Sequence, residues 1–268
     1  MSKTNALALL ELATTLATAA GAAVIDIRAE AVQTATTKVS PTDPVTEGDR
    51  LAEQIVVEGI LAERPDDGIV GEEGTSRQGT SGVVWYIDPI DGTTNYLYGL
   101  PAYSVSIAAA IDGEMAAGVV LNPATSEMFV ATRGGGARCN GRPISVSGGG
   151  DLSSALVATG FGYQAERRRQ QATVVAELLP QIRDIRRMGS AALDLCSVAA
   201  GRVDAYYELG LNSWDYAAGW LIAVEAGAVC NNLRSGPPDE RFLLASTPGV
   251  HDALTTVLGD LEADRPES

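Results

Sequence analysis

Asp88 and Asp91 are two carboxylates separated by two residues, and Gly92, Thr93 and Thr94 follow them directly. Carboxylate and backbone carbonyl oxygens are hard ligands of the kind that Mg²⁺ prefers. Small hydroxyl residues after a glycine can open a helix, and the free N–H groups at a helix start bind anions such as phosphate. This stretch therefore indicates a divalent metal ion that faces a phosphate group.

The element that must position these two acids is a strand. Residues 83–87 are an uninterrupted apolar run, which is typical of a buried strand. Asp88 and the proline after it are expected to end that strand. Both carboxylates would then lie at the strand's exit, beside the start of a short helix.

Further acids occur upstream. Glu72 and Glu73 lie between glycines after a short predicted strand, and the pattern alone allows either a solvated turn or metal ligands. Asp49 follows Thr46, which suits the N-cap of a helix predicted to run to about Ala62. A carboxylate in a first helical turn is favoured by the helix dipole, so Asp49 taken alone needs no other role.

The overall charge limits the possible partners. The chain has 268 residues and a formal net charge of −15. This charge argues against a nucleic-acid backbone as the main partner, although acidity can also serve solubility alone. An acidic protein that binds phosphate needs metal ions to reverse the local sign of the charge, which agrees with a metal site at Asp88.

Cysteine and histidine usage excludes other chemistries. Cys139, Cys196 and Cys230 are far apart, without metal-ligand or redox spacing, so a reducing, cytoplasmic compartment is expected. The only histidine, His251, is expected at the surface or in a cap. Ser-His-Asp chemistry and histidine-rich zinc sites are therefore excluded, and any hydrolysis must use carboxylates and metals.

The N-terminus could be either a helix or a signal peptide. Its Ala- and Leu-rich composition after one lysine loosely resembles a signal peptide. However, Leu9, Leu12, Leu16, Ala20 and Val24 recur at helical spacing on one face, which favours an amphipathic first helix. No stretch reaches the roughly 18 uninterrupted apolar residues of a membrane span, so no membrane association is expected.

Beyond the glycines at 148–150, strands and helices alternate, whereas the first half groups helices and then strands around a predicted hairpin at 112–113. This pattern indicates a mixed α/β protein. We expect an N-terminal α+β half (1–147) that carries most metal ligands and a C-terminal α/β half (148–268). The latter contains Ser190, a predicted cap of a helix over 191–200, and Asp215 just before another helix.

Taken together, these motifs resemble a known family. They are Asp88-Pro-Ile-Asp91-Gly-Thr-Thr-Asn95, Gly71-Glu72-Glu73, Trp214-Asp215-Tyr-Ala-Ala-Gly219 and, nearest the N-terminus, Asp43-Pro-Val-Thr46-Glu-Gly-Asp49. Their order and spacing resemble the inositol monophosphatase family over nearly the whole chain. The resemblance implies a five-layer αβαβα sugar-phosphatase fold and Mg²⁺-dependent hydrolysis of a phosphomonoester. It also implies a homodimer and inhibition by Li⁺.

The resemblance further implies roles for individual residues, with two to three Mg²⁺ ions in each site. Glu72, Asp88 and the Ile90 carbonyl would hold one ion, Asp88, Asp91 and Asp215 a second, and a weaker third would lie near Glu72. Thr93, hydrogen-bonded towards Asp49 and Glu72, would orient the attacking water without a covalent intermediate. The Gly92 and Thr93 N–H groups would bind phosphate, and the polyol would lie beside Gly189, Ser190, Ala191, Glu208 and Asp215.

Glu208, the compact segment between Glu73 and Val83, and the Gly-Thr-Thr-Asn form of the main motif favour inositol 1-phosphate as the substrate. Relatives of this fold act on histidinol phosphate, fructose-1,6-bisphosphate or 3′-phosphoadenosine nucleotides, and these remain alternatives. A further alternative is a binding or regulatory protein that keeps the fold without useful turnover.

Overall fold

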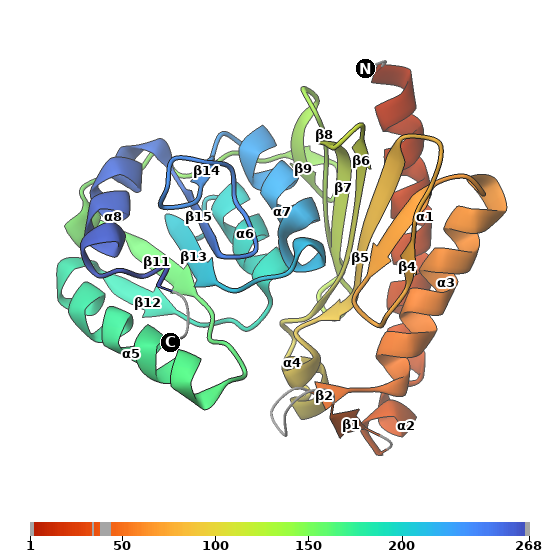
Figure 1. The fold of residues 1–268 in the computed structure, drawn as a ribbon, viewed down its shortest axis with the longest axis horizontal. Coiled ribbons are helices and arrows are strands. Elements are labelled where there is room, and N and C mark those ends of the chain that lie inside the picture. Colours follow the sequence, from red (N-terminus) through yellow and green to blue (C-terminus); the bar gives the residue numbers. More distant parts are fainter. Residues whose placement is uncertain (1–2, 34, 38–43, 266–268) are drawn as a thin grey trace.

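Helices and sheets alternate in five layers along the long axis of the molecule (Figure 1). The computed structural model describes residues 3–33, 35–37 and 44–265, so Asp43 of the most N-terminal motif lies outside the described residues. The helix layers are α1 (Lys3–Asp26) with α3 (Glu47–Glu63), α6 (Ala191–Ala199) with α7 (Ser213–Glu225), and α5 (Ala165–Leu178) with α8 (Pro248–Asp260). One sheet lies between the first and second helix layers and another between the second and third, which confirms the αβαβα fold expected from the sequence.

The first sheet has the strand order β10-β9-β8-β7-β6-β5-β3-β4. All neighbouring strands are antiparallel except β3 and β5, which are parallel. The predicted hairpin joins β6 to β7, where Asp112 and Gly113 both have positive φ values, 52° and 82°. The strands are β3 (Gly68–Gly71), β4 (Ser76–Arg77), β5 (Val83–Asp91), β6 (Ser104–Ile111), β7 (Glu114–Asn122), β8 (Glu127–Thr132), β9 (Gly136–Cys139) and β10 (Arg142–Pro143).

The second sheet has the order β12-β11-β13-β15-β14. Its strands are β11 (Leu156–Thr159), β12 (Asp184–Arg186), β13 (Ala205–Leu209), β14 (Val229–Asn231) and β15 (Phe242–Ser246). Strand β11 runs parallel to β12 and β13, whereas β15 is antiparallel to β13 and β14. The smaller elements are α2 (Arg28–Gln33), β1 (Thr36–Thr37), β2 (Pro44–Val45), α4 (Thr93–Tyr98) and the 3₁₀ turns η1 (Leu152–Ser154) and η2 (Leu179–Gln181).

The N-terminal segment forms the amphipathic helix that its spacing predicted. Leu9, Leu12, Leu16, Ala20 and Val24 are all buried in α1, in one core with α3 and the first sheet. By length and composition the stretch Asn5–Asp26 could also cross a membrane. A core helix of a soluble protein passes the same test, so this property alone carries little weight.

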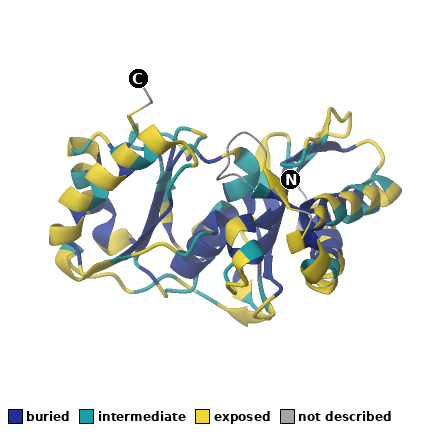
Figure 2. Ribbon diagram, turned by 90° about the horizontal axis from the view of Figure 1, so that it is seen from below, coloured by how far each residue is buried: buried dark blue, intermediate teal, exposed yellow. Residues whose placement is uncertain are grey.

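The middle helix layer joins the two sheets. Every residue of α6 is buried, and Figure 2 shows the central helices and the sheets beside them as the most deeply buried part of the fold. One hydrophobic cluster combines Val120 and Phe129 of the first sheet with Ala192 and Ala218 of the middle layer and Leu243 of the second sheet. The two sheets therefore share a core, and the expected boundary at residues 147 and 148 stays a prediction.

The expectation for His251 was wrong. The residue is only 7% exposed, and its side chain projects from the first turns of α8 onto β14 and β15 of the second sheet. The ring nitrogens are hydrogen-bonded to Ser246 Oγ at 2.7 Å and to the Asn231 side-chain amide at 2.8 Å. A helix start that packs on a sheet buries its first turn, and the local turn pattern could not show this packing.

Candidate active site

The strand that carries the two central acids does not end at Asp88, as the proline suggested, but continues to Asp91. Asp88 pairs with Ser106 and Asp91 with Ser104, so β5 has one extra residue in this interval. Residues three apart on a regular strand point to opposite faces, and one extra residue brings both to the same face. The proline lies in this bulge, where the absence of its N–H interrupts no regular ladder.

A cavity of about 480 Å³ opens beside this bulge, between the two sheets. Eleven predicted site residues line it: Glu72, Asp88, Ile90, Asp91, Gly92, Thr93, Gly189, Ser190, Ala191, Glu208 and Asp215. Both predicted halves contribute, because the first six precede residue 148 and the last five follow it. Asp49 is the one predicted site residue that lies behind the cavity wall rather than in it.

Asp88 is the most constrained acid of the cavity. Its side chain is 1% exposed, and its Oδ1 has no hydrogen-bond partner among the described residues. Burial raises its pKa well above the ordinary value, and the charges of Glu72, Asp91 and Asp215 raise it further. A buried carboxylate oxygen without a partner is costly, and a cation bound there would remove this cost.

Asp91 connects the first sheet to the middle helix layer. Its carboxylate accepts hydrogen bonds from Ser190 Oγ (2.6 Å) and from the backbone N–H groups of Ala192 (2.7 Å) and Ala191 (3.2 Å). Burial raises its pKa to about 7, although these hydrogen bonds act in the opposite direction. Ser190 also caps α6, as predicted, by accepting from the Leu193 N–H at 3.3 Å.

Thr93, in the cavity wall, and Asp49, behind it, form a buried pair. Thr93 Oγ1 lies 3.2 Å from Asp49 Oδ1 and 3.0 Å from the Ile90 carbonyl oxygen. Asp49 also accepts from the Thr46 N–H (2.7 Å) and Thr46 Oγ1 (2.6 Å) in the capping box of α3. Burial raises the pKa of Asp49 to about 7. The predicted contact of Thr93 towards Asp49 is present, and its contact towards Glu72 stays a prediction.

Gly92 and Asn95 hold the loop between the sheets. Gly92 has φ +95°, and a Cβ there would lie 2.9 Å from the carbonyl oxygens of both Ala102 and Gly189. Asn95, a residue of the motif with no assigned role, donates from Nδ2 to the Ala102 carbonyl (2.6 Å) and the Met188 carbonyl (2.7 Å). The motif therefore holds the loop at Met188 and Gly189 in place as well as carrying Asp88 and Asp91.

Asp215 approaches the cavity from the first turn of α7, and Glu208 approaches it from β13 of the second sheet. Asp215 caps α7 by accepting from the Asn212 N–H at 2.6 Å, and burial followed by the charges of Glu72 and Asp91 raises its pKa. Glu208 accepts from Tyr206 Oη at 2.6 Å. Burial raises the pKa of Glu208, while Tyr206 and the nearby arginines 187 and 167 oppose this effect.

The donor set fits a hard divalent cation, because it consists of carboxylates and one backbone carbonyl. Across residues 3–33, 35–37 and 44–265, no three acidic, histidine or cysteine side chains already converge as a ligand cluster. Asp91 accepts hydrogen bonds from the start of α6 and Asp215 accepts one from the Asn212 N–H, so both carboxylates have donors within the protein. The unpartnered Asp88 oxygen is the observation that indicates where a cation would bind.

Several further residues line the cavity without having been predicted as site residues, among them Phe161, Arg167, Arg187 and Asp194. Asp194 is 1% exposed, its Oδ1 has no partner among the described residues, and burial raises its pKa. Arg187 lies over the Phe161 ring, 6.0 Å from its centroid. The only available signal for Asp194 was an acid in the first turn of the Ser190-capped helix.

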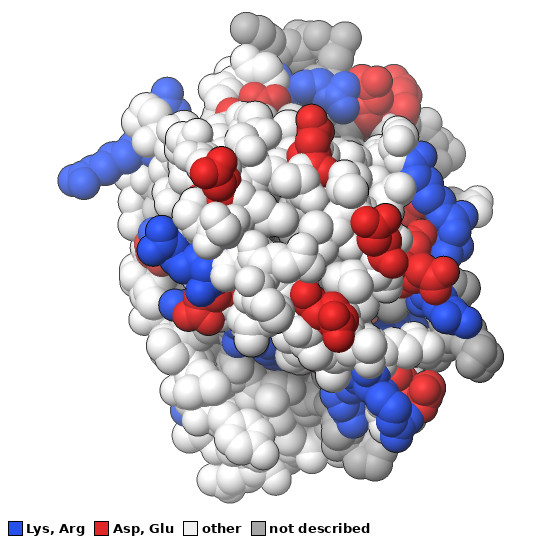
Figure 3. All heavy atoms as spheres, turned by 90° about the vertical axis from the view of Figure 1, so that its left-hand side faces the viewer, with Lys and Arg blue, Asp and Glu red and all other residues white. Residues whose placement is uncertain are grey.

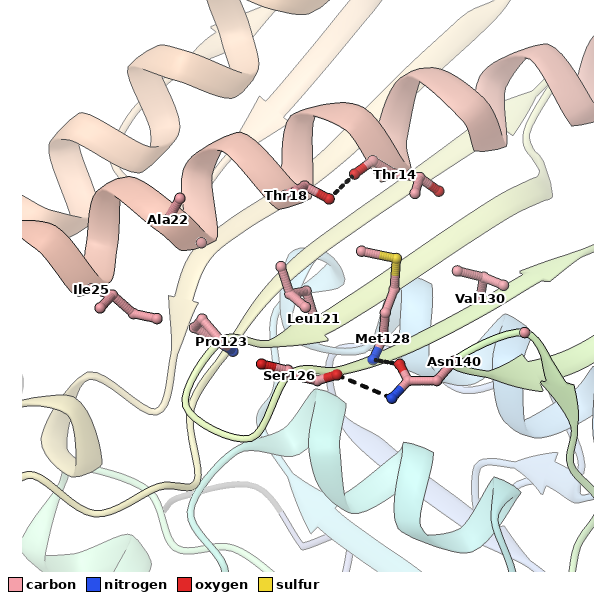
Figure 4. Close-up of a pocket in the computed structure, with 12 residues that line it drawn as sticks. Thr14, Thr18, Ala22, Ile25, Leu121, Pro123, Ser126, Met128, Val130 and Asn140 are labelled. Carbon is pink, nitrogen blue, oxygen red and sulfur yellow. Dashed lines mark hydrogen bonds between the residues drawn. The ribbon is translucent and has the colours of Figure 1, made fainter.

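A second cavity, of about 570 Å³, lies between α1 and the strands β7 and β8 (Figure 4). Its lining is mainly apolar, with Ile25, Leu121, Met128 and Val130, and it includes no charged side chain. It therefore supplies neither metal ligands nor charges that could bind phosphate, and the acid-lined cavity is the candidate active site.

The fold and this cavity define a phosphoric monoester hydrolase of the sugar-phosphatase type. Residues 6–261 match the model of the inositol monophosphatase family, and the chain belongs to that family. It is 46% identical over 233 residues to inositol-1-monophosphatase of Mycobacterium leprae, and the aligned region covers 82% of this chain and 80% of that protein.

Two other relatives extend the comparison. The chain is 46% identical over 225 residues to the Nus factor SuhB of Xylella fastidiosa, which covers 81% of this chain and 82% of that protein. The crystal structure of the extragenic suppressor protein suhB from Bartonella henselae superposes with a TM-score of 0.88 at 34% identity, covering 94% of this chain and 98% of that one.

Proposed function

We propose that this protein hydrolyses inositol 1-phosphate, or a closely similar polyol phosphate, to the free polyol and phosphate in a Mg²⁺-dependent reaction. The observation that carries the proposal is the buried, unpartnered oxygen of Asp88, surrounded by Glu72, Asp91 and Asp215 in a cavity between the sheets. The name of the Mycobacterium leprae relative supports the choice of substrate.

Each residue has a proposed role. Glu72, Asp88, the Ile90 carbonyl, Asp91 and Asp215 would hold two to three Mg²⁺ ions, and bound Mg²⁺ would supply charge neutralisation and a lowered pKa for water. Thr93, hydrogen-bonded to Asp49 and directed towards Glu72, would orient the attacking water and help to deprotonate it by passing the proton towards these carboxylates. A pKa of about 7 suits Asp49 to this role near neutral pH.

The polyol would bind at the other end of the cavity. Gly92 and Thr93 would bind the phosphate oxygens through their N–H groups, while Gly189, Ser190, Ala191 and Glu208 contact the hydroxyls. Glu208 has one oxygen occupied by Tyr206, so its remaining acceptor capacity is available for a polyol hydroxyl. Inositol 1-phosphate, histidinol phosphate, fructose-1,6-bisphosphate and a 3′-phosphoadenosine nucleotide form the substrate panel, and we expect the highest kcat/KM for the first.

The central test is Asp88→Asn, which keeps the size of the side chain and removes its charge. We expect Mg²⁺-dependent phosphate release to fall by about 100-fold or more, since a metal ligand is lost while the fold is kept. The control is Asp112→Asn in the distant β6–β7 hairpin, which should leave the rate unchanged. Near-normal turnover of the Asp88 variant, with an intact circular dichroism spectrum, would refute the assignment.

A regulatory role is the second candidate, because a similarly close relative is named as a Nus factor. The acidic net charge of −15 favours a protein or small-molecule partner over nucleic acid. Figure 3 shows the face that carries α5 and α8, and acidic and basic side chains are interspersed on it. Phosphate release by the purified chain, with and without Mg²⁺, separates an enzyme from a purely regulatory protein.

The remaining expectations are part of this proposal. We propose a cytoplasmic homodimer that is inhibited by Li⁺ and associates with neither membranes nor nucleic acid. Light scattering should give twice the chain mass of 27.8 kDa. Increasing LiCl should inhibit phosphate release, whereas equal KCl should not.

A further inference from the structure

A buried carboxylate outside the proposed site holds the turn that carries Glu72. Glu53 lies on α3 with 5% of its side chain exposed. Its Oε2 accepts a hydrogen bond from the Glu73 N–H at 2.8 Å. Its Oε1 accepts from the Thr75 N–H at 3.2 Å and from Thr75 Oγ1 at 2.6 Å. Three donors thus satisfy one buried charge, and bonds to an ionised acceptor are among the stronger hydrogen bonds.

These donors belong to the turn between β3 and β4. The turn is closed by a hydrogen bond from the Gly71 N–H to the Thr75 carbonyl at 2.7 Å. On the other side, the Glu72 N–H donates to the Ile87 carbonyl of β5 at 3.1 Å. Strand β5 therefore holds the Glu72 N–H, and Glu53 holds the N–H groups of Glu73 and Thr75, which follow it in the chain.

The approach of Glu53 also explains a glycine of the motif. A Cβ at Gly71 would lie 2.6 Å from Glu53 Oε2, which is too close for a real contact. The φ angle of Gly71 is not positive, so its backbone conformation does not require glycine. The close carboxylate instead favours glycine at this position, since a larger residue would displace Glu53 from its hydrogen bonds to the turn.

We propose that Glu53 is a positioning residue, which holds the turn at residues 71–75 so that the Glu72 carboxylate faces Asp88 and the metal site. This inference rests on the proposed Mg²⁺-dependent function. Residues that orient metal ligands typically affect metal affinity by about 10- to 100-fold when they are changed.

The test is Glu53→Gln, which keeps the volume but turns an NH₂ group towards backbone donors. We expect Mg²⁺ binding to the full chain, measured by titration calorimetry, to weaken by about 10-fold or more. The Mg²⁺ concentration for half-maximal phosphate release should rise by a similar factor. The matched control is Glu58→Gln on the same helix, an exposed acid whose contact is the Gln54 side chain, and its Mg²⁺ affinity should stay within about twofold of wild type.

A second pair of variants acts on the donor side of the same contact. Thr75→Val removes one of the three donors, and Thr75→Ser restores it. We expect the valine variant to weaken Mg²⁺ binding several-fold and the serine variant to keep it, even if Glu53→Gln does not fold.

The outcomes separate this inference from the proposed function. Wild-type Mg²⁺ affinity in both Glu53→Gln and Thr75→Val, with only the melting temperature lowered in EDTA, would show a merely structural role and overturn the inference alone. A wild-type chain that neither binds Mg²⁺ nor needs it for turnover would overturn both.

Discussion

At the scale of single residues, glycine positions control how closely the parts of the site approach one another. Gly92 combines a left-handed backbone with two carbonyl oxygens 2.9 Å from the position of a Cβ. Gly113, in the β6–β7 turn, has φ +82° and no atom within 4 Å of a Cβ. Alanine substitutions at Gly92 and Gly113 can therefore be compared to separate the cost of backbone strain from the cost of a steric clash.

We predict that Gly92→Ala lowers the free energy of unfolding by about 3 kcal/mol, from strain of about 1–2 kcal/mol plus displacement of two backbone segments. Gly113→Ala should cost only the strain, about 1–2 kcal/mol. Denaturant unfolding measures both values. Phosphate release should fall for the first variant and not for the second, and equal effects of the two substitutions would contradict the close packing at Gly92.

At the scale of elements, the approach of α7 to the first sheet determines where Asp215 lies. A Cβ at Gly118 of β7 would lie 3.0 Å from the Ala218 carbonyl oxygen and 3.2 Å from its Cα. Both atoms belong to the backbone of α7, which cannot move away alone. The absence of a side chain at Gly118 therefore allows the helix to lie close against the sheet.

We predict that Gly118→Val destabilises the fold by about 1–3 kcal/mol, because it overpacks this contact. It should also lower kcat, since α7 carries Asp215 at its N-terminus. The control is Val130→Ile on β8, which adds a methylene beside the apolar cavity of Figure 4. An unfolding free energy and kcat close to wild type for Gly118→Val would contradict this account.

The packing of α8 on the second sheet gives a pH dependence. Burial lowers the pKa of His251 below its ordinary value of 6.5, although the charge of Asp252 opposes the shift. Between the lowered pKa of the folded chain and 6.5, the unfolded chain binds more protons, so the His251 contribution to stability decreases as the pH falls from 6.5 towards that lowered pKa.

Melting temperatures of wild type and His251→Gln, measured from pH 8 down to pH 5.5, test this dependence. Because other groups titrate in both proteins, the difference between the two curves is the informative quantity. We expect the advantage of the wild type to shrink as the pH decreases, and parallel curves would rule out the effect.

At the scale of the whole molecule, the proposed metal ligands come from the first sheet and from α7 of the middle helix layer, so a bound cation would link these two layers. The chain should then be stabilised by Mg²⁺ through mass action, by about 2.7 kcal/mol at 100 times the dissociation constant. Differential scanning calorimetry in saturating Mg²⁺ and in EDTA measures this difference. Asp88→Asn should melt at nearly the same temperature in both buffers, and a shift as large as that of wild type would place the stabilising ion elsewhere.

Much of the fold was predictable from local pattern. The period of Leu9, Leu12 and Leu16 predicted α1, and the hydroxyls of Thr46 and Ser190 predicted two helix starts. The acids at 72, 88, 91 and 215 were all identified as candidate ligands, and they line one cavity. These features depend on residues close in sequence, or on motif order, and both can be read from the chain.

Only the tertiary structure decided which distant groups meet. The bulge after Asp88, the burial of His251, the contact of Glu53 with the turn at residues 71–75, and the presence of Asp194 in the cavity all depend on strand pairing and helix packing. Local hydrogen bonds and hydrophobic periodicity specify elements, whereas contacts between elements follow from sheet order and from how closely backbones approach. The sequence therefore determined the chemical groups of this site, and the packing of the two sheets around α6 and α7 determined their arrangement.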